Sequence, residues 1–197
     1  MSVQPIQNPV EVLTSRIWEL TKGRLGPLLV AIDGRSGAGK STLAAAVSVR
    51  TGGAVIDGDD FYAGGSAETW DAMTPSQMVE HCMDWRSQRG VLEDLSQRRT
   101  ASWLPYDWNA DDGSRSRIPL TRQPTDLVIL EGAYSARPEL ADLLTLKVLL
   151  DTPPLIRRQR LLEREGERYR AEWEARWACA EEHYFETAMR KGAFDGS

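Results

Sequence analysis

The amino-acid sequence predicts an α/β domain built on a parallel sheet, and three observations support this prediction. Residues 28–32 form an apolar run of strand length, after which come a glycine-rich loop and a stretch of helix formers. Three more strand-like runs follow: a short one at residues 54–56, one at 127–130, and one at 146–150, where Lys147 interrupts apolar residues. Each run is followed by an acidic residue, and helical patterns or long connections separate the runs. This alternation is typical of parallel strands joined by crossover helices.

Length and composition fit a single globular domain. The 197 residues are enough for one α/β core, and 41% hydrophobic with 27% charged residues is ordinary for a globular protein. A formal net charge of −5 argues against a nucleic-acid-binding surface. Cys82 and Cys179 have no metal or redox spacing, the N-terminus is polar, and no apolar run approaches the ~18 residues of a membrane span. We therefore expect a cytoplasmic protein without nucleic-acid or membrane partners.

The loop after the first strand matches a phosphate-binding motif. Residues 34–41 fit G-x-x-x-x-G-K-[ST], and the preceding strand and following helix stand in the order that the motif requires. Glycines let the backbone turn its N–H groups toward an anion, and the following helix points its positive end at the same place. Lys40 is expected to reach the β- and γ-phosphates, and Ser41 is expected to offer its hydroxyl to Mg²⁺. The predicted nucleotide-binding residues are Gly34, Arg35, Ser36, Gly37, Ala38, Gly39, Lys40, Ser41 and Thr42.

Acidic residues follow the second and third strands. Asp57, Asp59 and Asp60 come directly after the second strand, and Glu131 closes the third in the manner of a Walker B strand. The carboxyl ends of parallel strands share one edge of the sheet, and ligands bind at that edge in open α/β domains. We expect a catalytic or metal-binding role for at least one acid of the 57–60 group. The sequence leaves Asp57, Asp59 and Asp60 as alternatives for the base.

The N-terminal and central segments have patterns of their own. Residues 1–9 are polar and predict a loose tail, and residues 10–20 place apolar side chains on one helical face. The insertion at residues 63–120 is long and rich in tryptophan. Within it, Thr74 begins a helix with a capping-box pattern that includes Gln77. Long insertions in α/β domains often build the substrate site, and we expect that role for this segment.

Helices are predicted before and after the fourth strand in the sequence. A short helix is expected at residues 138–144, before that strand. After it, a lid is expected at residues 153–168, in which three arginines share one helical stripe at i, i+3 and i+7: Arg157, Arg160 and Arg164. Arg168 extends the stripe if the helix continues past Gly166. A last helix, at residues 168–191, carries aromatic side chains at similar spacing, which suit either a core or the interface of a homodimer.

Together these motifs resemble uridine kinases and their relatives, the P-loop small-molecule kinases that include phosphoribulokinase and bacterial pantothenate kinase. Five stretches in the family's order carry the resemblance: the phosphate loop, Asp59-Asp60-Phe61-Tyr62, Pro105-Tyr106-Asp107-Trp108, Glu131-Gly132, and the arginine helix after Asp151-Thr152. The resemblance implies one P-loop NTPase domain over residues 1–197. Its fold would be a three-layer α/β/α sandwich with a central parallel sheet of four to five strands, a helical lid and an inserted substrate-binding segment.

The resemblance also implies roles for individual residues. Asp59 looks like the general base and a metal-associated acid, and Glu131 looks like a second acid near Mg²⁺, which Ser41 would also bind. Asp84 and Tyr106 look like substrate contacts, with Asp107 in support. The remaining catalytic residues implied are Lys40 and the lid arginines Arg157, Arg160 and Arg164.

Three places depart from the family pattern. Uridine kinases usually have a histidine after the Tyr-Asp-Phe segment, where this chain has Asn109, Ala110, Asp111 and Asp112. Trp85 follows Asp84 where the family has a His-Pro pair. Residues 190–197 have little strand character, although the family has another strand there.

The activity implied is Mg²⁺-dependent transfer of the γ-phosphoryl group of ATP to a hydroxyl of a small molecule, either nucleoside-like (uridine or cytidine) or sugar-like. A nucleoside monophosphate kinase is an alternative, with Arg86, Arg98 and Arg99 available for an acceptor phosphate. A regulatory ATPase without a small-molecule acceptor is a second alternative, although the chain has no N-K-x-D guanine motif. A binding protein on a decayed kinase fold is a third, against which the joint presence of Lys40 and the strand-end acids argues.

Overall fold

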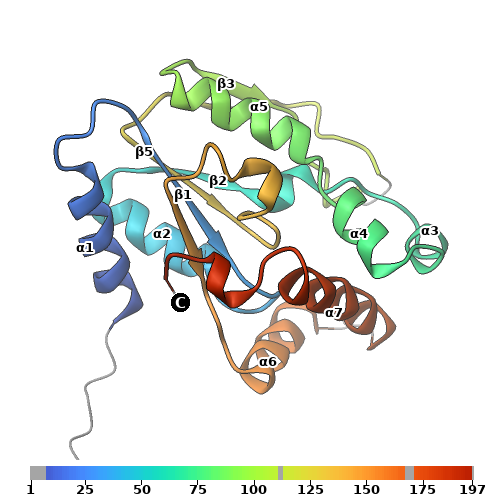
Figure 1. The fold of residues 1–197 in the computed structure, drawn as a ribbon. Helices are drawn as coiled ribbons and strands as arrows, with labels where there is room; N and C mark the ends of the chain where they lie inside the picture. The colour runs from blue at the N-terminus through green and yellow to red at the C-terminus, as the bar shows by residue number, and fades with distance from the viewer. Residues whose placement is uncertain (1–7, 111–112, 167–170, 197) are drawn as a thin grey trace, which may run out of the picture.

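The computed structural model describes residues 8–110, 113–166 and 171–196 (Figure 1). Four parallel strands form the central sheet in the order β2-β5-β1-β6: β1 Leu28–Asp33, β2 Ala54–Asp57, β5 Leu127–Glu131 and β6 Leu146–Leu149. All four lie where apolar runs predicted them, which confirms the predicted α/β class. The register pairs Ile32 with Glu131 and Asp57 with Glu131, so the acids that end β2 and β5 are neighbours.

Helices cover both faces of the sheet because the side chains of β1 alternate between two cores. Leu28, Val30 and Ile32 pack with α1 (Pro9–Thr21) and α2 (Lys40–Thr51). Leu29 faces the opposite side and packs with α5 (Trp85–Ser96). This arrangement is the predicted three-layer sandwich. Pro9 belongs to α1, whose N-cap is Asn8, so the predicted tail is one residue shorter; residues 1–7 lie outside the described residues.

The insertion between β2 and β5 folds into small elements on one face. It follows the 3-10 turn η1 (Gly58–Phe61) and contains α3 (Ala67–Asp71), α4 (Pro75–His81), α5 and an antiparallel ribbon of β3 (Ala101–Trp103) with β4 (Leu120–Arg122). The capping box predicted at Thr74 and Gln77 is present at the start of α4. Periodicity did not predict β3 and β4, because three residues are too few to display an alternating pattern.

Helices α6 (Pro154–Glu165) and α7 (Ala171–Glu186) lie side by side near the phosphate loop (Figure 1). The predicted last helix was too long, because α7 ends at Glu186 and only a 3-10 turn, η4 (Lys191–Ala193), follows. The helix expected at 138–144 is also shorter and is the 3-10 turn η2 (Pro138–Leu140). Gly166 ends α6 with a φ of 54°, and Arg168 of the predicted stripe lies outside the described residues.

The C-terminal residues take part in the sheet through a single bridge. Gly196 forms a parallel bridge with Val148, and the N–H of Leu149 donates to the Gly196 carbonyl at 2.9 Å. This bridge stands beside β6, so the sheet has four strands and a one-residue extension. Within the described part of the chain, no helix has both the length and the apolar character needed to cross a membrane.

Candidate active site

The phosphate loop joins β1 to α2 in a conformation that requires glycine. Gly37 and Gly39 have φ values of 75° and 99°. A Cβ at Gly37 would lie 2.6 Å from the carbonyl oxygen of Arg157, so no larger residue fits. Gly39 is the N-cap of α2, and no side chain caps the helix. The first N–H groups of α2 are therefore available to an anion. Nucleotide binding by residues 34–42 stays a prediction with this geometry in its support.

Asp33 anchors the start of the loop, and the sequence analysis did not name it as a site residue. Its Oδ1 accepts from the N–H of Gly34 at 2.7 Å and of Tyr134 at 3.1 Å. Its Oδ2 accepts from the N–H of Ala136 at 2.9 Å and from the Tyr184 hydroxyl at 2.7 Å. Complete burial raises the pKa of this carboxyl despite the four donors. The only local signal was an acid at the end of an apolar strand.

Lys40 and Ser41 begin α2 and lie next to the strand-end acids. The ammonium of Lys40 is buried and donates to the Arg35 carbonyl at 3.2 Å. Glu131 is 3% exposed and lies near Ser41, whose side chain acts to lower the pKa of this carboxyl. Burial, followed by repulsion from Asp57, raises the pKa of Glu131 to about 7. Asp57 is partly open to solvent, yet desolvation at the sheet edge, followed by repulsion from Asp59, raises its pKa to about 6.

The three alternative acids after β2 have different surroundings. Asp57 caps η1, because its Oδ1 accepts from the N–H of Asp59 at 2.9 Å. Asp60 accepts from the indole N–H of Trp103 at 3.0 Å, and its backbone carbonyl accepts from Arg115. The carboxylate of Asp59 is exposed and has no hydrogen bond or ion pair with another described residue. Asp59 is therefore the acid of the three that is free to meet a ligand.

Two of the three predicted lid arginines contact the phosphate loop. Arg157 donates from Nη1 to the Ser36 carbonyl at 3.2 Å. Arg160 donates from Nη1 to the carbonyls of Gly37 and Ala38, at 3.3 and 2.9 Å. Arg164 is one turn further along, is 64% exposed at its side chain, and pairs with Glu165. The single stripe predicted for these residues therefore reaches the loop only at its first two positions, and a lid role for Arg164 stays a prediction.

The predicted substrate contacts lie in the insertion and make local contacts. Asp84 is the N-cap of α5 and accepts from the N–H and hydroxyl of Ser87 at 3.1 and 2.6 Å. Asp107 accepts from the N–H of Asn109 at 3.0 Å. Tyr106 is buried, and its ring meets the edge of Tyr62 with centroids 4.9 Å apart. Substrate binding by these three residues stays a prediction.

An aromatic cluster surrounds Tyr62. Trp108 stacks on its ring with centroids 5.2 Å apart and planes inclined by 14°, and Trp70 stacks on it at 6.0 Å. Trp177 of α7 meets the Tyr62 ring edge-on at 5.9 Å. The cluster connects the insertion to α7, and Trp70 and Trp108 of the insertion pack on the Tyr62 ring within it.

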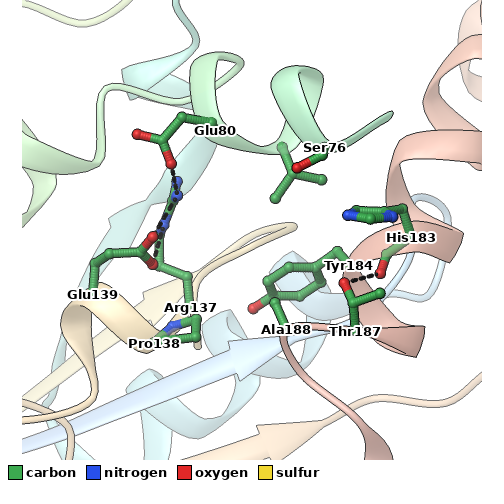
Figure 2. A pocket seen from close by; sticks show the side chains of 10 residues that line it. Ser76, Glu80, Arg137, Pro138, Glu139, His183, Tyr184, Thr187 and Ala188 are labelled. Atoms are coloured by element: carbon green, nitrogen blue, oxygen red, sulfur yellow. Dashed lines mark hydrogen bonds and ion pairs between the residues drawn. The ribbon is translucent and has the colours of Figure 1, made fainter. Parts of the chain in front are cut away.

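Cavities in the described part of the chain lie apart from the phosphate loop. One, of about 610 Å³, is bordered by Phe61, Asp84, Trp103 and Arg115. The other, of about 330 Å³, lies between α4, η2 and the end of α7, with Arg137 and His183 on its walls (Figure 2). Arg137 is buried there and pairs with Glu139 at 2.9 Å and Glu80 at 3.6 Å. None of the residues predicted to act in catalysis lines this second cavity.

Solved structures share this fold. A structure described as a possible uridine kinase, from Bacillus stearothermophilus, aligns with a TM-score of 0.69 and 22% identity over 95% of this chain and 96% of its own. A candidate fructose transport system kinase from Silicibacter sp. TM1040 gives 0.63 and 21%, over 88% of both chains. D-glycerate 3-kinase from Cryptococcus neoformans gives 0.61 and 13%, over 95% of this chain and 90% of its own. No protein-family model and no curated protein sequence matches the chain.

The strand order, the phosphate loop and these neighbours define the fold class. The chain has the P-loop kinase fold of the uridine kinase type, as the sequence resemblance implied. At identities of 13% to 22%, this likeness shows the fold alone.

Proposed function

We propose that the protein is an ATP-dependent phosphotransferase that acts on a hydroxyl of a small molecule. The observation that carries this proposal is the meeting of four groups at the carboxyl ends of β1, β2 and β5. Lys40 and Ser41 come from the phosphate loop, Glu131 ends β5 near both of them, and Asp59 follows β2 with an exposed carboxylate. A possible uridine kinase and a D-glycerate 3-kinase among the structural neighbours are consistent with this activity.

The residues at this sheet edge fit Mg²⁺. No group of three or more histidine, cysteine or acidic residues in the described chain could hold a metal ion alone. Mg²⁺ does not need such a cage, because it keeps several waters and binds one or two carboxylates together with substrate phosphates. Ser41 and Glu131 would hold it, with Asp59 joining directly or through water. When bound, Mg²⁺ would supply positive charge beside the phosphate oxygens.

Different residues of the chain would then serve different steps of phosphoryl transfer. The N–H groups from Gly37 to Thr42 would bind the phosphates, and Lys40 would neutralise charge on the β- and γ-phosphates. Asp59 would orient the acceptor hydroxyl and take its proton. Arg157 and Arg160 already lie on the outer side of the loop and would turn toward the transferred group as α6 closes over it.

The acceptor is proposed to be a nucleoside or a sugar-like alcohol, bound against the insertion with Asp84, Tyr106 and Asp107 in its walls. The contacts of three arginines weigh against a nucleoside monophosphate. Arg98 pairs with Asp126 at 2.9 Å, and Arg99 pairs with Asp94 at 2.6 Å. Arg86 lies over the Trp85 ring, 4.2 Å from its centroid. An acceptor phosphate would have to displace these partners.

A metabolite panel tests the proposal. Purified protein is given Mg·ATP with nucleosides, sugars, sugar acids, pantothenate or nucleoside monophosphates, and ADP release is measured. We expect release to rise at least tenfold above the basal rate with one hydroxyl-bearing class, and to disappear in Lys40→Ala, as expected when electrostatic stabilisation worth about 10²–10³ is lost. ATP consumption that no metabolite changes would favour a regulatory ATPase instead.

A further inference from the structure

A carboxylate from the C-terminal part of the chain holds the third residue of the phosphate loop. The N–H and the hydroxyl of Ser36 both donate to Oε1 of Glu181, at 2.8 and 2.6 Å. Glu181 lies on α7 and is only 4% exposed. The carbonyl of Ser36 accepts from Arg157 of α6. Two helices that follow the sheet thus occupy every polar group of this residue.

The peptide unit between Arg35 and Ser36 is fixed at both ends. Its N–H donates to Glu181, and its carbonyl accepts from the ammonium of Lys40 at 3.2 Å and from the N–H of Ala38 at 3.1 Å. Because a peptide unit is planar, rotation of this unit would break all three hydrogen bonds together. A carboxylate on the N–H also polarises the peptide and makes its carbonyl a better acceptor for an ammonium. Glu181 therefore acts on Lys40 without touching it.

Neighbouring side chains on α7 hold the chain before this peptide, at Asp33, and at Arg35 itself. Tyr184 donates its hydroxyl to Asp33, at the end of β1. The ring of Phe185 lies under the guanidinium of Arg35, 5.1 Å from the ring centroid. Glu181, Tyr184 and Phe185 are spaced i, i+3 and i+4, which places them on one face of the helix. The contact with Ser36 is thus one part of a continuous surface between α7 and residues 33–36.

We propose that Glu181 is a positioning residue for nucleotide binding. It orients the 35–36 peptide so that Lys40 keeps its place in the loop, and it keeps the Ser36 amide and hydroxyl occupied, so that the phosphates meet only the amides that follow. The inference rests on the nucleotide half of the proposed function and does not depend on the acceptor.

Nucleotide titration without acceptor tests the inference. Glu181→Ala removes both hydrogen bonds to Ser36 and should weaken the binding of Mg·ATP about tenfold. Mg·ADP should weaken less, because Lys40 also reaches the γ-phosphate. Glu181→Gln should stay within about threefold of wild type, because an amide oxygen can still accept both bonds. Glu182→Ala is the matched control, since Glu182 is exposed on the same helix, and should bind as wild type does.

The outcomes separate positioning from simple stabilisation. A contact that only stabilised the fold would lower the melting temperature and leave the ratio of ATP to ADP affinity unchanged. Wild-type affinity in Glu181→Ala, or equal losses for both nucleotides, would overturn the inference. If Glu181→Ala does not fold, Glu181→Asp replaces it, because a side chain one methylene shorter cannot keep both bonds; unchanged ATP affinity there overturns the inference equally. Failure of the wild-type protein to bind any nucleotide would instead count against the proposed function.

Discussion

Asp57, Asp59 and Asp60 have identical side chains and different contacts in the fold. Asp57 caps a turn, and Asp60 holds the Trp103 indole. Desolvation at its packed position raises the pKa of Asp60. Asp59 lies on the same turn with an exposed carboxylate. These three acids therefore differ in their hydrogen-bond partners, although they are close neighbours in the sequence.

Replacing these acids one at a time tests the assignment of the base. Asp59→Asn should lower kcat by about 10²–10⁴, the usual contribution of a general base, and leave nucleotide affinity near that of wild type. Asp60→Asn should keep most of the turnover and lose about 1 kcal/mol of stability, because its hydrogen bond to Trp103 weakens. Steady-state kinetics and thermal melts measure both. If Asp60→Asn loses turnover and Asp59→Asn keeps it, the base is Asp60.

Glu131 is a buried acid whose folded-state pKa of about 7 lies above its ordinary value of 4.5. The folded state therefore binds this proton more tightly than the unfolded state does. The stability that the protonated form contributes is fully present below pH 4.5 and is lost as the pH rises through 7. Without Mg²⁺, the ionised group destabilises the fold at alkaline pH.

Glu131→Gln should consequently raise the melting temperature of the metal-free protein at pH 8, by an amount on the order of 5 °C. The difference from wild type should shrink toward pH 5, where both side chains are neutral. Melts in buffer containing a chelator, at several pH values, measure this trend. A difference that does not change with pH would show that charge at Glu131 is not its cause.

Among the elements, α6 and α7 surround the phosphate loop from the outside. Arg157 and Arg160 of α6 bind its carbonyls, and Glu181 of α7 binds the Ser36 N–H. Thr152, just before α6, donates its hydroxyl to the Ala38 carbonyl at 3.0 Å. The two helices also pair with each other through Arg158 and Glu174, 3.6 Å apart. A movement of α6 would thus change the hydrogen bonds that it makes to the phosphate loop.

The arginines of α6 should differ in their effect on transfer. Arg160→Ala should lower kcat about 10- to 100-fold, because it removes a cation held at the loop. Arg158→Ala removes an exposed ion pair with α7 and should change kcat less than twofold. Both variants are compared at saturating Mg·ATP and acceptor. Equal effects of the two substitutions would contradict a lid role for the stripe of α6 that carries Arg160.

On the scale of the whole molecule, sheet topology assembles the site. The order β2-β5-β1-β6 places the ends of β2 and β5 beside the loop that follows β1, so residues from three separate segments meet at one edge. α7 then reaches the same place from the C-terminal part of the chain, through Tyr184 and Asp33, 151 positions apart. Ligand binding at this edge should be linked to the stability of the complete fold.

Nucleotide binding should therefore raise the melting temperature. A ligand that binds only the folded state at 100 times its Kd stabilises by about 2.7 kcal/mol, which corresponds to roughly 5–10 °C for a protein of this size. Wild type with Mg·ATP should show this shift in a thermal melt, and Lys40→Ala should show little of it. A shift of equal size in the variant would place the nucleotide elsewhere than the phosphate loop.

The sequence by itself determined the parallel sheet, the phosphate loop and the set of candidate acids. These features depend on neighbours in the chain: an apolar run, the glycines around Lys40, and an acid after a strand are all local patterns. For the same reason the capping box at Thr74 was predicted correctly. The three-residue strands β3 and β4 were not, because they are too short to carry such a pattern.

Only the tertiary structure decided which groups hold the loop in place. Asp33 looked like the end of a strand, and Glu181 looked like one acid among several on a helix, until folding brought them to Tyr184 and Ser36. It also decided that Asp59 is free while Asp60 is held by Trp103. The physical reason is that hydrogen bonds between residues far apart in the chain depend on how the elements pack, which a pattern of neighbouring residues does not contain.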